Sequence, residues 1–273
     1  MMRSNSLPSR LPSALPIRPR CQVDPVDLLG WDDHEDVAAP RSSHSPTAPP
    51  IADGDRYSCA WKPHQPHTGR RPPERGVANF RGSSVDDEGR EIVLESTLEQ
   101  AAARIALANR RAKRVHPQVG RVFYEDANGS EHHSTLDFVV AGANDNSLAI
   151  AVKPKRKRVS SGIDDTLAAI RDQVPGFADA YAVWTEDELP RYAEHNAALI
   201  IRSRRMRNAD DVRDMMHLTA KMHGAVHIGD LLPHANCGTA RAFTAIVNLI
   251  DEGFLLAAPH ARFGPGLPVR VAA

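Results

Sequence analysis

The stretch TLDFVVAGANDNSLAIAVKPKRKR, residues 135–158, decides the fold of this chain. Its runs TLDFVV and LAIAVK are rich in apolar and β-branched residues, and the segment between them is rich in Gly, Asn, Asp and Ser. This pattern is typical of two consecutive strands joined by a turn. The first strand contains Asp137, and the second ends in Lys153.

Side chains on a strand point alternately to its two faces, which predicts the neighbours of these charged residues. Ala151 and Lys153 are expected to share one face of the second strand. On the first strand, Leu136 and Phe138 are expected on one face and Asp137 on the other. Pairing of the two strands would then bring Asp137 towards Lys153.

The neighbouring segments predict helices and strands around this pair. Apolar residues three and four apart indicate an amphipathic helix over 92–108, and either Glu95 or Glu99 on it could join Asp137. The elements that follow are expected at 119–126, 132–140 and 148–153 (strands), 162–174 (helix), 179–185 (strand) and 186–203 (a helical stretch). The order α-β-β-β-α-β predicts an α/β fold built in layers.

The chain is expected to divide into three parts. Residues 1–75 contain most of the 21 prolines and few periodic apolar positions, which predicts a disordered tail. Residues 76–206 hold the α/β elements. Residues 207–273 predict helices followed by a hairpin, which is typical of a winged helix-turn-helix domain.

Composition narrows the classes of protein to consider. The 273 residues carry a formal net charge of +0, so binding of nucleic acid would depend on local basic patches. No apolar run approaches the ~18–20 residues that a membrane span requires. The sequence also contains no Gly-rich phosphate loop of the kind that binds a nucleotide cofactor. The three cysteines lie far apart, which suits a reducing compartment. We therefore expect a cytoplasmic protein with no membrane contact and no small-molecule cofactor.

Three segments resemble the N-terminal domain of TnsA-type endonucleases: STLEQ at 96–100, EHHSTLDFVV at 131–140 and LAIAVKPK at 148–155. That family belongs to the restriction-endonuclease-like PD-(D/E)XK group. The resemblance implies an αβββαβ core, a Mg²⁺ site, and cleavage of DNA at the ends of mobile elements beside a partner transposase. The family's motif falls on Glu99, Asp137 and Lys153 as catalytic residues, with Glu99, Asp137 and the backbone carbonyl of Val152 as metal ligands.

These residue types suit the hydrolysis of a phosphodiester. Carboxylate and carbonyl oxygens are the ligands that a hard divalent cation prefers. Such a cation polarises the phosphate and lowers the pKa of the attacking water. A lysine beside it can orient that water and neutralise charge that develops on the phosphate.

One position departs from the family's motif. Ala151 stands where the family has Glu or Gln, so the chain offers two carboxylates instead of three donors. Two functions are therefore compatible with the sequence: a metal-dependent endonuclease subunit, and a nuclease-type fold that binds DNA or a partner without cutting. A third is a transcriptional regulator in which the winged helix does the main work.

Basic residues mark the expected DNA-binding surfaces. Clusters occur at 104–121, at 153–158 and at 202–207. The C-terminal helix is expected to present polar groups to DNA, Asn248 among them, and wing residues Arg262 and Arg270 could add contacts. The residues singled out for DNA binding are Lys155, Arg156, Lys157, Arg158, Arg241 and Thr244.

Overall fold

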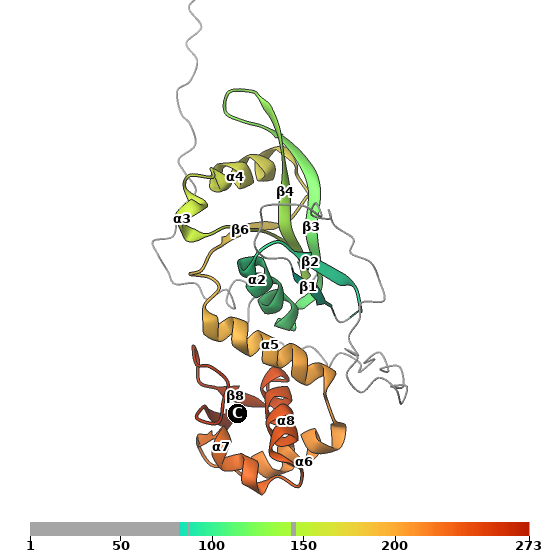
Figure 1. Ribbon diagram of the computed structural model, residues 1–273, viewed down its shortest axis with the longest axis vertical. Helices are drawn as coiled ribbons and strands as arrows, with labels where there is room; N and C mark the ends of the chain where they lie inside the picture. The colour runs from blue at the N-terminus through green and yellow to red at the C-terminus, as the bar shows by residue number, and fades with distance from the viewer. Residues whose placement is uncertain (1–81, 87, 143–145, 273) are drawn as a thin grey trace, which may run out of the picture.

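The computed structural model describes residues 82–86, 88–142 and 146–272 of the chain, and it has the mixed α/β architecture that the sequence predicts (Figure 1). The segment 1–75, for which the sequence predicts disorder, lies outside the described residues.

The centre of the molecule is a four-stranded mixed sheet. Its strands are β3 (Ala112–Glu125), β4 (Glu131–Gly142), β5 (Ser147–Val152) and β6 (Ala180–Trp184), in the spatial order β3-β4-β5-β6. The pairs β3–β4 and β4–β5 are antiparallel, and β5–β6 is parallel. A parallel pair needs a crossover connection, which here contains α3 (Lys155–Arg158) and α4 (Ile163–Gln173).

Two apolar layers cover the faces of this sheet. On one face, α2 (Thr97–Ala108) and α5 (Arg191–Arg205) pack over Ile150 and Val152. On the other face, α4 packs over Ala149 and Ala151. The alternation predicted along 149–152 is therefore confirmed, and Lys153 follows the strand, which ends at Val152.

The alternation predicted for the preceding strand is wrong at one point. Leu136 packs in the layer under α4, whereas Phe138 packs in the layer under α2 and α5. The β3–β4 register shifts between Val119 and Val122, beside Leu136, and the β4–β5 ladder ends at Phe138. The extra residue lies in β3, where three steps oppose two in β4, and such a bulge increases the local twist of the pair, so that successive β4 side chains reach different layers.

The helix expected over 92–108 begins later than predicted. Residues Glu91–Leu94 form strand β2, which pairs with β1 (Gly82–Val85) in a separate antiparallel hairpin. Ser96 has extended backbone angles and caps α2, which starts at Thr97. The apolar periodicity extended the prediction too far because Ile92 and Leu94 are buried from a strand.

The C-terminal part has its own apolar core. The helices α6 (Ala209–Thr219), α7 (Ile228–Leu231), η1 (Leu232–His234) and α8 (Thr239–Asp251) pack around it, beside strands β7 (Val226–His227), β8 (Leu255–Ala257) and β9 (Pro268–Val271). The strand order is β7-β9-β8, with antiparallel pairs. Asn208 caps α6 as the sequence predicts, since its side chain accepts hydrogen bonds from the N–H groups of Asp210 and Asp211.

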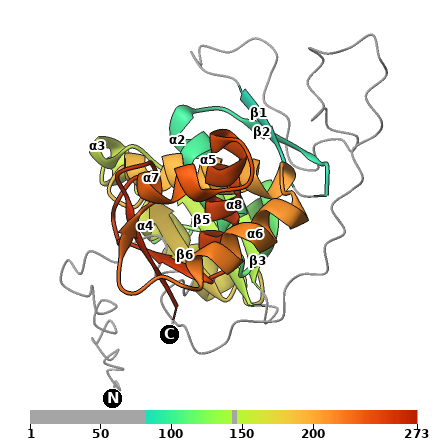
Figure 2. The ribbon, with the colours of Figure 1, turned by 90° about the horizontal axis from the view of Figure 1, so that it is seen from below.

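Helix α5 joins the two cores. It packs against both α2 and α8, and Val247 of α8 is buried in the core that α2 and α5 form (Figure 1). The loop between β8 and β9 is also fixed to α5, because Asn196 donates to the carbonyl of Ala261 and accepts from the N–H of Phe263. Seen from below, α8 lies over α5 (Figure 2).

Candidate functional site

Asp137 lies where two neighbouring strands separate. The β4–β5 ladder runs from Ala141 opposite Ser147 to Phe138 opposite Ile150. Beyond that pair, Asp137 Oδ2 accepts a hydrogen bond from the backbone N–H of Val152 at 2.7 Å. The carboxylate thus replaces a main-chain acceptor and holds β4 to the end of β5.

Glu99 closes the N-terminus of α2. Its N–H donates to Ser96 Oγ at 3.1 Å, while its Oε1 accepts from that hydroxyl at 2.9 Å and its Oε2 accepts from the N–H of Glu95 at 2.9 Å. This arrangement is a variant of the capping box, in which Ser and Glu three residues apart satisfy free N–H groups. The spacing of Ser96 and Glu99 is the signal from which the cap could have been predicted.

The charge of Asp137 acts on Glu99. Burial raises the pKa of Glu99 above its ordinary value of 4.5, the hydrogen bond from Glu95 opposes that rise, and the negative charge of Asp137 adds to it. Two like charges at close range each disfavour ionisation of the other. Of the two glutamates that periodicity left open, the structure places Glu99 in the helix and Glu95 before it.

Lys153 and Ala151 occupy different environments. The N–H of Lys153 donates to the carbonyl of Trp184 at 3.0 Å, directly after β5, and its half-buried side chain makes no hydrogen bond or ion pair with any described residue. Ala151 is 2% exposed and packs under α4 with Ile163 and Leu167. Position 151, where the TnsA-type motif has its third metal donor, therefore lies in the apolar core.

The donor set that remains consists of two carboxylates. Within residues 82–86, 88–142 and 146–272, no group of three or more His, Cys, Asp or Glu side chains could hold a metal ion. Mg²⁺ is commonly bound through one or two protein carboxylates together with water and substrate phosphate. Glu99 and Asp137 are two carboxylates, the number that this mode of binding requires. Val152 donates its N–H to Asp137, and the role predicted for the Val152 carbonyl as a metal ligand stays a prediction.

In the basic run after β5, two side chains form ion pairs and two are exposed without a side-chain partner among the described residues. Lys155 Nζ lies 2.6 Å from Asp187, and its N–H donates to Glu186. Arg158 forms a two-pronged pair with Asp164, at 3.0 and 2.8 Å. The side chains of Arg156 and Lys157 are exposed and have no partner among the described residues.

In the other two predicted basic clusters, several arginines bind acidic side chains or carbonyls of the fold, whereas Lys113, Arg114, Arg121 and Arg202 are exposed. In the first, Arg104 pairs with Glu194 at 2.7 Å. In the second, Arg204 binds Asp251, Arg207 binds Glu252, and Arg205 donates to the carbonyl of Val85. These arginines hold elements together.

Helix α8 presents less polar surface than the sequence predicts. Arg241 forms a two-pronged ion pair with Asp211 at 2.7 and 2.6 Å, and Thr244 Oγ donates to the carbonyl of Ala240 one turn earlier. Asn248 is 2% exposed, so its expected contact with DNA is wrong. Packing of α8 against α5 and α6, which helical periodicity alone does not show, buries Asn248, whereas Arg241 stays exposed.

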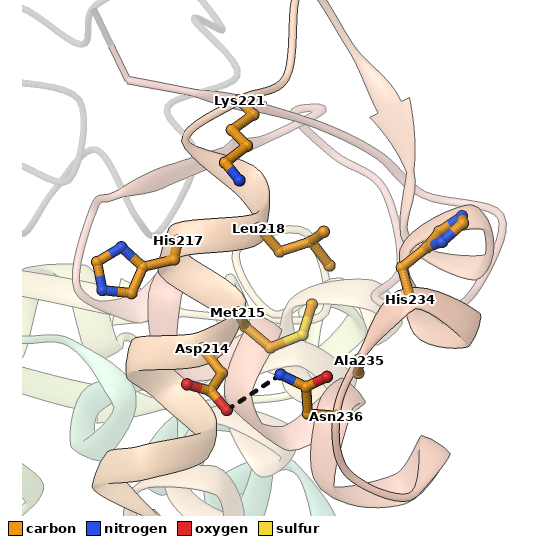
Figure 3. Close-up of a pocket in the computed structure, with 8 residues that line it drawn as sticks. All are labelled: Asp214, Met215, His217, Leu218, Lys221, His234, Ala235 and Asn236. Atoms are coloured by element: carbon orange, nitrogen blue, oxygen red, sulfur yellow. Dashed lines mark hydrogen bonds between the residues drawn. The ribbon is translucent and has the colours of Figure 1, made fainter.

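A cavity of about 210 Å³ lies in the C-terminal part, on other elements than Glu99 and Asp137. Met215 and Leu218 of α6 form its apolar wall, and Asn236 donates to Asp214 across it at 3.5 Å. The rings of His217 and His234 lie far apart at its two sides (Figure 3). They do not converge on a common ligand.

No protein-family model matches the chain, and no curated protein matches it in sequence. No helix in the described part of the chain is long and apolar enough to cross a membrane.

Proposed function

We propose that this chain is a metal-dependent DNA endonuclease subunit of the TnsA type, acting with a partner transposase at the ends of mobile elements. In this proposal the sheet with α2 and α4 is a PD-(D/E)XK core, and the C-terminal part is a winged helix-turn-helix. The observation that supports it is that Asp137, on a strand, accepts a hydrogen bond from Val152, the residue before Lys153, while its charge acts on Glu99 in the first turn of a helix.

Each residue has a role in phosphodiester hydrolysis. Glu99 and Asp137 would hold Mg²⁺, which when bound polarises the phosphate and lowers the pKa of the attacking water. The amine of Lys153, which has no partner among the described residues, donates hydrogen bonds to a phosphate oxygen and offsets its developing negative charge. Arg156 and Lys157 hold the adjoining DNA backbone by charge.

A second function is favoured by a specific observation. Ala151 is packed in the core, and both oxygens of Glu99 already accept hydrogen bonds that cap α2. Such a site suits a nuclease-type fold that binds DNA or organises an assembly without cutting. The same basic residues would then contact DNA, with no role for the carboxylates beyond folding.

Nicking of supercoiled plasmid separates the two functions. The protein is assayed in Mg²⁺ and in Mn²⁺, alone and with an integrase-type transposase if its gene neighbourhood encodes one. The matched control is Asp137→Asn, which keeps an oxygen acceptor for the N–H of Val152 but removes the charge. Cutting that Asp137→Asn abolishes supports the endonuclease. DNA binding without cutting under every condition rules the endonuclease out and leaves the binding module.

A further inference from the structure

An apolar side chain protrudes from the basic turn that follows Lys153. Val159 is 90% exposed, the highest value among the large hydrophobic residues identified as exposed. It directly follows the single-turn helix α3, all of whose residues are basic. A lone exposed valine is ordinary on a protein surface, so its meaning depends on what holds it and what surrounds it.

Hydrogen bonds fix the conformation of this turn. The N–H of Lys157 donates to the carbonyl of Pro154 at 2.7 Å, and the N–H of Ser161 donates to the carbonyl of Lys157 at 2.9 Å. Val159 itself accepts from the N–H of Gly162 at 3.2 Å. Gly162 has a φ of 61°, a conformation that glycine adopts readily, and it starts α4. The exposure of Val159 therefore belongs to a defined turn.

In the same turn, two of the four basic side chains form ion pairs within the protein and two do not. Lys155 and Arg158 are anchored to Asp187 and Asp164, which ties the turn to the segment after β6 and to α4. Arg156 and Lys157, between them, are left to attract an external anion. Two cations beside an apolar tip complement double-stranded DNA, which presents phosphates beside the sugars and base edges of its minor groove.

We propose that Val159, flanked by Arg156 and Lys157, enters the minor groove of duplex DNA and partly unstacks one base step next to the scissile phosphate. This deepens the proposed function and rests on it, because it takes DNA as the substrate of the site at Lys153. The two cations bind phosphates, and Val159 supplies an apolar contact with sugar and base edges. Lys155 and Arg158 hold the turn in place.

The experiment measures binding and unstacking in the Asp137→Asn background, so that cleavage does not enter. A short duplex carries 2-aminopurine at successive positions, and both its affinity and its fluorescence are followed as salt is varied. The test variants are Val159→Ser and the double variant Arg156→Gln/Lys157→Gln. The matched controls are Phe123→Ser, which removes an apolar side chain that is 55% exposed elsewhere, and Lys221→Gln, which removes an exposed charge of the C-terminal part.

Each test variant has its own expected signature. Val159→Ser should weaken binding by about tenfold and abolish the rise in 2-aminopurine fluorescence, while the salt slope stays unchanged. Loss of both cations should reduce the slope of log K against log salt by about 1.8, since each phosphate contact contributes about 0.9. The controls should behave as the parent protein, and circular dichroism should show all variants folded, because the changed side chains are exposed.

Several outcomes overturn the inference. The inference fails if Val159→Ser binds and unstacks DNA as the parent does, or if the parent binds no duplex at low salt. It also fails if the variants keep DNA binding and lose association with a protein partner, which would make the turn a protein contact. The proposed function fails separately: a protein that never nicks plasmid, yet needs Val159 to unstack DNA, refutes the endonuclease and the scissile phosphate, and retains only the contact of Val159 with the minor groove.

Discussion

Replacement of Arg204 by methionine should destabilise the whole protein, because this side chain joins three helices. Its guanidinium makes two hydrogen bonds of 2.8 Å to the carboxylate of Asp251 at the end of α8. It also donates to the carbonyls of Leu107 and Ala108 at the end of α2, at 2.9 and 2.6 Å. Arg204 itself lies in α5, so one side chain links α2, α5 and α8.

The magnitude follows from burial of the partner. The side chain of Asp251 is 4% exposed, and removal of Arg204 would leave its charge buried without the ion pair. Breaking a buried ion pair from one side typically costs about 3–5 kcal/mol of unfolding free energy. That cost is a large share of the ~5–15 kcal/mol by which natural proteins are stable.

Urea unfolding followed by far-ultraviolet circular dichroism measures this cost. Arg207→Met is the matched control, since Arg207 pairs with Glu252 at side-chain exposures of 36% and 30%, and such pairs contribute about 0–1 kcal/mol. The double variant Arg204→Met/Asp251→Asn should recover part of the loss, because it also removes the stranded charge. If Arg204→Met costs no more than Arg207→Met, the helices are not held together in this way.

Three further predictions concern the site. Asp137→Ala should cost about 1–3 kcal/mol in urea unfolding because it removes the acceptor of the Val152 N–H, whereas Asp137→Asn should cost less. The pKa of Glu99 is raised in the folded protein, so stability should fall as pH rises from 4.5 through that pKa; Glu99→Gln should flatten this part of the pH profile of unfolding. Ala151→Glu should lower Tm, because it introduces a carboxyl at a position that is 2% exposed. If the new carboxyl joins those of Glu99 and Asp137 at a metal ion, MgCl₂ should restore part of the lost Tm.

Each of these has a result that contradicts it. Equal unfolding free energies of Asp137→Ala and Asp137→Asn would mean that the bond to Val152 contributes nothing measurable. A pH profile unchanged by Glu99→Gln would mean that Glu99 titrates as an ordinary carboxyl. Ala151→Gln is the uncharged control for Ala151→Glu, and an equal response of both to MgCl₂ would show that no third ligand has been gained.

Local patterns predicted much of the central fold. Alternation along 149–152 predicted the faces of β5 correctly, and helical periodicity located α2, α4 and α8, because each of these signals comes from neighbours in the chain. The start of α2 was misplaced because Ile92 and Leu94 are buried in the core from strand β2. Apolar residues two apart, such as Ile92 and Leu94, are compatible with both the strand period and the helix period when the segment is short.

The linear pattern of residues identified the candidates: a carboxylate at Glu95 or Glu99, the carboxylate of Asp137, Lys153, and the basic run after it. The tertiary structure alone decided which of them are available. It engaged Arg241 and Arg204 in ion pairs with Asp211 and Asp251, buried Asn248, and left Arg156 and Lys157 without a partner among the described residues. The physical reason is that a side chain's partners come from elements far away in the chain, which no local period encodes.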